Sequence, residues 1–270
     1  MLENQSVTEI QKNISSRQIS IREVMEYYLD KIEKINPNLN AIVLQKDRKL
    51  LIEEAVEKDK INEIQKPLNG LPIAIKDLTD VVGFKTTYGF PGSKNNLPSK
   101  NSLFVNRIID KGAIVIGKTN TAELGVGGHT TNRLFGPTSN VYELSKSAAG
   151  SSGGASSAVA AGLLPFADGT DQMGSCRGPA AYANIYGFRP TPGLISADRT
   201  GQKLDLPILT TPGCLARTPN DMSILLDAIV GSDLLDKFSF DLNHSFQNQN
   251  LSDKDFSSLK IGWLSNMNGK

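Results

Sequence analysis

Histidine and cysteine are scarce in this 270-residue chain, which contains two of each. With so few histidines, the usual base of a nucleophilic site has few candidates. Two cysteines cannot form a disulfide framework, and the polar first ten residues do not resemble a signal peptide. Cys176 and Cys214 are therefore expected to be free and buried, in a cytoplasmic protein. Neither a metal nor a cofactor is expected.

The chain also has no large excess of positive or negative charge and no long apolar run. Lysine and arginine number 29 and aspartate and glutamate 28, a net charge of +1. Without a basic field, binding to nucleic acid or to an anionic membrane is not expected. The most apolar window, 158–167, is short and broken by Gly162 and Pro165, far from the roughly 20 residues that a membrane span needs. The chain is predicted to be soluble.

The length predicts a single domain over residues 1–270. Two capping boxes, Ser6 with Glu9 and Ser20 with Glu23, predict helix starts near the N-terminus. The second helix is expected to stop at Pro37. Further along, helix and strand candidates alternate, which favours an α/β fold with a sheet between helices. The strand candidates are Ala41–Leu44, Ile73–Ile75, Ala113–Ile116 and Leu259–Leu264; the helix candidates are Ser102–Lys111 and Ala155–Ala161; residues 233–258 form a predicted polar surface loop.

Two glycine-flanked serines, Ser151 and Ser175, are the strongest chemical signal. A serine hydroxyl needs a base to become a nucleophile, and a lysine can serve if its environment keeps it neutral. Lys76 ends the apolar run 71–75, where burial would lower its pKa. Taken alone, the same pattern also fits a surface lysine and a flexible loop.

Six ordered motifs surround these residues, and together they resemble the amidase signature family of serine hydrolases. The motifs are GLPIAIKD (70–77), GKTNTAELG (117–125), FGPTSN (135–140), AAGSSGG (148–154), GTDxxGSxRxPAA (169–181) and YGFRPTPG (186–193). The resemblance implies a mixed central β-sheet flanked by helices. Family members are nearly twice as long, so we expect an N-terminal half whose sheet is incomplete at the C-terminus. Its exposed faces would promote self-association, for example as a homo-oligomer.

The resemblance also implies roles for individual residues. Ser175 would be the nucleophile that forms an acyl-enzyme from a small-molecule amide. Ser151, held by a cis peptide bond, would relay the proton to Lys76. The N–H groups of Gln172, Met173, Gly174 and Ser175 would form the oxyanion hole. The family commonly has Gly-Gly where this chain has Met173-Gly174, which affects the shape of that loop.

Supporting roles are expected for a further group of residues. Ser152 would bond the Lys76 amine, and Asp171 would pair with Arg177 to hold the nucleophile loop. Gly125 and Gly127 would line the substrate pocket. Three other residues are interpreted as non-catalytic: Cys176 as packing, His129 as a surface group or substrate contact, and His244 as part of the polar loop.

Three alternatives stay open at this point. One is the amide-hydrolysing subunit of a tRNA-dependent amidotransferase, and another is a non-catalytic or inactive amidase fragment. The third is a nucleotide-binding protein, since Gly112–Thr119 matches the phosphate-loop pattern G-x-x-x-x-G-K-[ST]. A phosphate loop needs the middle residues free to wrap phosphates, whereas Ala113–Ile116 is expected to be a strand. We therefore interpret this match as a coincidence.

Overall fold

A computed structural model of the chain describes residues 2–3, 5–61, 66–197, 209–247, 257–260 and 262. The helices are α1 (Val7–Ser15), α2 (Ile21–Leu39), α3 (Arg48–Lys60), α4 (Leu103–Asp110), α5 (Gly153–Ala160), α6 (Arg177–Tyr182) and α7 (Pro219–Ile229), with short 3-10 turns η1 (Pro91–Ser93) and η2 (Glu123–Gly125). The strands are β1 (Ile42–Gln45), β2 (Pro72–Lys76), β3 (Ile114–Thr119), β4 (Phe166–Asp171), β5 (Tyr186–Phe188) and β6 (Thr211–Ala216). The expected α/β class is confirmed. Within the described ranges, no helix is long and apolar enough to cross a membrane.

The described strands form two three-stranded sheets. The first, in the order β1-β3-β2, is mixed, because β3 is antiparallel to β1 and parallel to β2. The second, in the order β4-β6-β5, is antiparallel. A hydrogen bond joins them, since the Lys76 N–H donates to the Asp168 carboxylate at 2.8 Å. The C-terminal end of β2 therefore lies beside β4.

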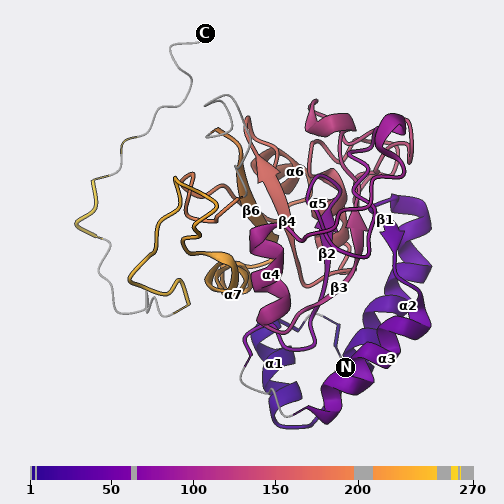
Figure 1. Cartoon of the computed structure of the whole chain (residues 1–270), viewed down its shortest axis with the longest axis vertical. Helices are drawn as coiled ribbons and strands as arrows, with labels where there is room; N and C mark the ends of the chain where they lie inside the picture. Colours follow the sequence, from indigo (N-terminus) through magenta and orange to yellow (C-terminus); the bar gives the residue numbers. More distant parts are fainter. Residues whose placement is uncertain are drawn as a thin grey trace.

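Helices cover both sheets. α2 packs on α3 along one side of the molecule, and α4 packs on α7 on the other (Figure 1). α5 lies between them and contacts strands of both sheets. Small residues allow this close approach: a Cβ on Gly154 would lie 2.4 Å from the Asn120 nitrogen and 2.6 Å from the Ala41 oxygen. The helix that follows Ser151 is thus packed directly against the backbone where β3 ends and β1 begins.

The N-terminal helices follow the predicted capping, but α2 does not end where expected. Both capping boxes are present. Pro37, however, lies inside α2, so the predicted stop at this residue is wrong. A proline so near the end removes only one backbone donor and leaves no further turns to disrupt. The helix ends instead at Leu39, and its C-cap Asn40 is left-handed with φ of 53° and donates its N–H to the Asn36 carbonyl at 2.8 Å.

Other predicted elements agree with the structure to within a few residues. β1 contains three of the four residues predicted as a strand at 41–44, and β2 contains all of the strand predicted at 73–75. α4 and α5 match the predicted helices. In the described part of the predicted polar loop, residues 233–247 contain an isolated bridge between Asp233 and Asp236, and the Asp227 carboxylate accepts from the Phe246 N–H at 2.7 Å. Of the predicted strand Leu259–Leu264, residues 259, 260 and 262 are described and are not part of a strand, and the other three lie outside the described residues.

Candidate active site

Lys76 is the last residue of β2 and is fully buried. Its Nζ lies at hydrogen-bond distance from three hydroxyls: Ser151 Oγ at 2.8 Å, Ser152 Oγ at 2.7 Å and Thr170 Oγ1 at 2.9 Å. The first two come from the start of α5 and the third from β4. The predicted contact between Ser152 and the amine is confirmed. The interpretation of Lys76 as a surface lysine is excluded by its burial.

The surroundings of Lys76 favour its neutral form. Burial lowers the pKa of Lys76 to about 8, although the nearby acidic groups Cys176, Asp168 and Asp171 act in the opposite direction. Desolvation penalises the ammonium because the low-dielectric interior stabilises charge poorly. A lysine with this pKa is neutral in an appreciable fraction of molecules near pH 7, so it can accept a proton.

Ser151 lies in a loop that is fixed on several sides. The Gly150–Ser151 peptide bond is cis, as the family resemblance implies. The Ser151 carbonyl accepts from the Ala122 N–H at 3.2 Å and from Thr130 Oγ1 at 3.2 Å. These contacts hold the residue so that its hydroxyl faces the Lys76 amine.

Ser175 lies next to this pair. Its carbonyl accepts from the Ser152 N–H at 3.2 Å, which brings the two serine-containing loops together, and its side chain is half-buried. Among the described residues, no hydrogen bond joins the Ser175 hydroxyl to Ser151 or Lys76. The backbone positions therefore converge, and the hydroxyl contact between Ser175 and Ser151 stays a prediction.

The loop carrying Ser175 is tied to a buried carboxylate. Arg177 donates to both oxygens of Asp171 at 3.0 Å, which confirms their predicted pairing. The Cys176 N–H donates to the same carboxylate at 3.1 Å, and Arg189, which the sequence did not suggest, approaches it at 3.5 Å. Burial alone would raise the pKa of Asp171, but the hydrogen bonds from Arg177 and the loop N–H groups lower it to about 2. Asp171 is therefore ionised at neutral pH.

One predicted oxyanion donor has another partner. The Gly174 N–H donates to Asp171 Oδ1 at 2.8 Å, so in this structure it is committed to the carboxylate and its predicted role needs correction. The N–H groups of Gln172, Met173 and Ser175 are the remaining candidates. The Met173 side chain is 91 % exposed and does not fill the site.

The two cysteines are free and fully buried, as predicted. Burial raises the pKa of Cys176 to about 12 and also raises that of Cys214. A thiol with such a pKa is protonated at neutral pH and is a poor nucleophile. The interpretation of Cys176 as packing is consistent with both observations.

The glycine-rich loop proposed to line the pocket lies beside the Ser151 loop. A Cβ on Gly150 would lie 3.0 Å from the Gly127 carbonyl oxygen, whereas one on Gly125 would meet the Leu78 side chain. His129 is exposed, and its Nδ1 lies 2.8 Å from Ser147 Oγ. In the described part of the chain, neither His129 nor the exposed His244 makes a hydrogen bond or ring contact with the side chains around Lys76.

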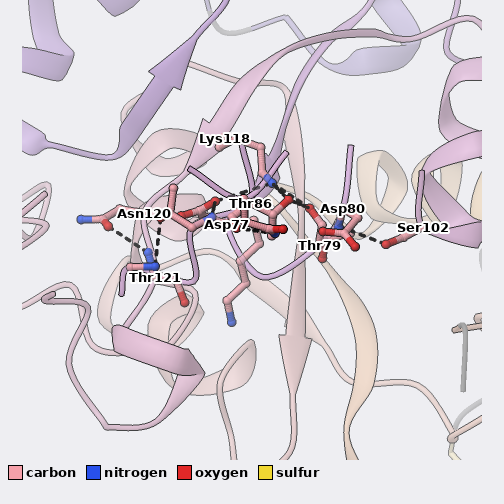
Figure 2. Close-up of polar contacts among 12 residues, drawn as sticks. Asp77, Thr79, Asp80, Thr86, Ser102, Lys118, Asn120 and Thr121 are labelled. Carbon is pink, nitrogen blue, oxygen red and sulfur yellow. Dashed lines mark hydrogen bonds and ion pairs between the residues drawn. The ribbon is translucent and has the colours of Figure 1, made fainter. Parts of the chain in front are cut away.

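A second buried lysine lies beside the site, in the segment that matches a phosphate loop. Lys118 is on β3, whose residues pair with both β1 and β2, so the strand interpretation of this segment is confirmed. Figure 2 shows its Nζ directed at Asp77, Thr79 and Thr86. The amine donates to the Thr79 carbonyl at 2.7 Å and lies 3.6 Å from the Asp77 carboxylate. These contacts occupy Lys118 in the interior instead of leaving it free for a phosphate.

Sequence reasoning missed Thr170 and Asp168. Thr170 belongs to the GTD motif, but its contact with Lys76 spans 94 positions along the chain. Asp168 is fully buried and bonds the Lys76 N–H across 92 positions. The available signal was a second aspartate, Asp168, directly before the GTD motif of this strand. Across the part of the chain that the structure describes, no group of three or more His, Cys, Asp or Glu side chains is arranged to hold a metal ion.

The chain is similar in sequence and in fold to known amidases. An acylamidase of Rhodococcus erythropolis is 37 % identical over 97 % of this chain and 55 % of that protein. A glutamyl-tRNA(Gln) amidotransferase subunit of Thermus thermophilus is 37 % identical over 88 % of this chain and 49 % of that protein. A bacterial aryl acylamidase of the amidase signature family superposes with a TM-score of 0.82 at 31 % identity, covering 90 % of this chain and 51 % of that structure.

The chain thus spans about half the length of the relatives that it matches. The family model described as Amidase matches residues 23–270, which include every residue of the candidate site. The chain belongs to the amidase family.

Proposed function

We propose that the protein hydrolyses a carboxylic amide through an acyl-enzyme, with Ser175 as nucleophile, Ser151 as proton relay and Lys76 as base. The observation that carries the proposal is the fully buried Lys76 amine, 2.8 Å from the Ser151 hydroxyl and with its pKa lowered by burial. A buried lysine of depressed pKa that contacts a serine is a recognised means of activating a hydroxyl nucleophile. A cytoplasmic location is part of the proposal, since both cysteines are free.

In the first step, Ser175 Oγ attacks the amide carbonyl while its proton passes to Ser151, and the Ser151 proton passes to Lys76. The carbonyl oxygen of the tetrahedral intermediate becomes negative and needs preorganised donors. The N–H groups of Gln172, Met173 and Ser175 would supply them, with the loop held by Asp171. The C–N bond then breaks, and the leaving amine takes back the proton from Lys76 through Ser151.

In the second step, water attacks the acyl-enzyme by the same route. Lys76 accepts a proton from water through Ser151 and then returns it by the same route to the Ser175 oxygen, as the bond from that oxygen to the acyl carbon breaks and the carboxylic acid leaves. No group outside the chain is required for the proton balance. The loop 124–129, with Gly125 and Gly127, would contact a small amide substrate next to Ser151.

The test is to replace Ser175 with alanine and measure hydrolysis of a simple aryl amide. Ser175→Ala should reduce turnover to background, whereas His129→Ala, which changes an exposed residue, should leave the chemical step largely intact. Mass spectrometry after treatment with a fluorophosphonate should locate the adduct on Ser175. An adduct on Cys176 or on a histidine would overturn the assignment of the nucleophile.

A second candidate function is the amide-hydrolysing subunit of a tRNA-dependent amidotransferase. It is favoured by several relatives with 32–37 % identity that are glutamyl-tRNA(Gln) amidotransferase subunits. The two candidates differ in substrate. Release of ammonia from glutamine, with no turnover of aryl amides, would support the amidotransferase role; the reverse pattern would support a general amidase.

A further inference from the structure

Asp168 is a buried carboxylate that the proposed chemistry does not use. It lies on β4, opposite Cys214 of β6, and is fully buried. Its Oδ1 accepts from the Lys76 N–H at 2.8 Å. Among the described residues, its Oδ2 has no hydrogen-bond partner. A carboxylate that is buried and only half satisfied costs stability, so its presence beside Lys76 calls for a physical explanation.

Lys76 is held by β4 at two points. Alternate residues of a strand point to the same face, so Asp168 and Thr170 project together. Asp168 contacts the backbone N–H of Lys76, and Thr170 Oγ1 contacts its Nζ at 2.9 Å. The same face of one strand therefore fixes both ends of the lysine.

The charged groups around Asp168 come from several elements. Lys76 and Lys118 attract its negative charge, and the acidic groups on which that charge acts are Cys176 and Cys214. Lys118 has its own acidic partner, because Asp77 lies 3.6 Å from its Nζ (Figure 2). Burial raises the pKa of Asp168 to about 6, against the hydrogen bond from the Lys76 N–H and the charges of the two lysines. Asp168 is thus mainly ionised at neutral pH and acts on Lys76.

We propose that Asp168 is a positioning residue that holds the Lys76 backbone and, through its negative charge, keeps the buried amine basic enough to accept the serine proton. The inference rests on the proposed function, since it assigns Lys76 as the base. Burial weakens the affinity of the amine for a proton, and a nearby carboxylate restores part of it. Catalysis by a base is most efficient when its pKa lies near the working pH.

Asp168→Asn tests the charge separately from the hydrogen bond, because the amide oxygen can still accept from the Lys76 N–H. Without the carboxylate, the ammonium loses stabilisation, so the acid limb of kcat/KM should move to lower pH. A shift of about one unit corresponds to a roughly tenfold change in the fraction of neutral lysine on the acid side. The maximal rate should fall, since the amine becomes a weaker base.

Asp221→Asn is the matched control. Asp221 is also buried, and its carboxylate also accepts a backbone N–H, from Val7 at 2.7 Å. It is not among the charges that act on Lys76. The control makes the same chemical change in the interior and should leave the position of the acid limb where it is in the parent protein.

The outcomes separate this inference from the proposed function. If Ser175→Ala abolishes turnover but Asp168→Asn leaves the acid limb unmoved, the inference is wrong and the proposed function stands. If Asp168→Asn does not fold, Asp168→Ser, which keeps an acceptor, takes its place. If the protein has no turnover, the pKa of Lys76 can be followed by NMR with 13C-labelled lysine, assigned through Lys76→Arg. An unchanged Lys76 pKa in the folded Asp168 variant would overturn the inference without reference to activity.

Discussion

Replacing Asp77 with asparagine should destabilise the fold, because it leaves the buried Lys118 ammonium without its acidic partner. Both side chains are fully buried, and the two charged atoms lie 3.6 Å apart. Breaking a buried ion pair by removing one partner costs about 3–5 kcal/mol. At a denaturant dependence of about 3 kcal/mol per molar urea, the unfolding midpoint would move down by about 1 M or more.

The stability lost in Asp77→Asn should become smaller as the pH rises. Burial already lowers the pKa of Lys118 in the folded state, with Asp77 opposing that effect. Between the lower folded pKa and the higher unfolded pKa, the unfolded chain binds more protons, so the unfolding free energy rises with pH. Removing Asp77 lowers the folded pKa further and widens this interval. The deficit of Asp77→Asn should therefore be smaller at about pH 9.5 than at about pH 7.

Urea unfolding followed by circular dichroism would measure both effects. The double variant Asp77→Asn, Lys118→Met provides the control, since removing both charges should recover much of the loss. A loss below about 1 kcal/mol for Asp77→Asn would contradict the reasoning, because that is the range of an exposed ion pair. So would a double variant that is no more stable than Asp77→Asn alone.

Two further predictions concern Lys76 and Gly154. Since the pKa of Lys76 is about 8 and the base must be neutral, kcat/KM for an amide should fall about tenfold per pH unit below this value and level off above it. A flat profile between about pH 6 and pH 8 would contradict Lys76 as the base. Gly154→Ala should lower the unfolding free energy by about 1–3 kcal/mol, because the added Cβ would lie 2.4 Å from the Asn120 nitrogen. In thermal melts, the control Gly128→Ala should be nearly neutral, because its Cβ would have nothing within 4 Å.

Features set by neighbouring residues could be predicted from the sequence, and features set by distant ones could not. The capping boxes at Ser6 and Ser20 involve partners three residues away, so the pattern specifies the contact directly. The family motifs pointed to Lys76, Ser151 and Ser175; the Lys76 amine contacts the Ser151 hydroxyl, and the Ser175 carbonyl contacts the Ser152 N–H. Asp168 was missed because its importance depends on β4 lying beside β2, a contact across 92 positions that no local pattern encodes.

The end of α2 and the Gly174 N–H are two features for which the prediction from the local sequence was wrong. In both cases a contact made in the folded chain overrides the local pattern. Pro37 is accommodated because the final turn closes through Asn36 and Asn40. The Gly174 N–H is taken by Asp171, which was expected only to pair with Arg177. A hydrogen-bond donor can be identified in a sequence, but its partner depends on the folded chain.

The three hydroxyls around the Lys76 amine have a consequence for how a proton moves. An ammonium group donates three hydrogen bonds, whereas a neutral amine donates two and accepts one. A hydroxyl can be donor or acceptor, and its hydrogen rotates to suit the partner. Ser151, Ser152 and Thr170 can therefore satisfy the nitrogen in either charge state at the distances observed, 2.7–2.9 Å. The cage of oxygens can stay still while only hydrogen atoms turn, so the lysine can gain or lose a proton with little rearrangement of the surrounding core.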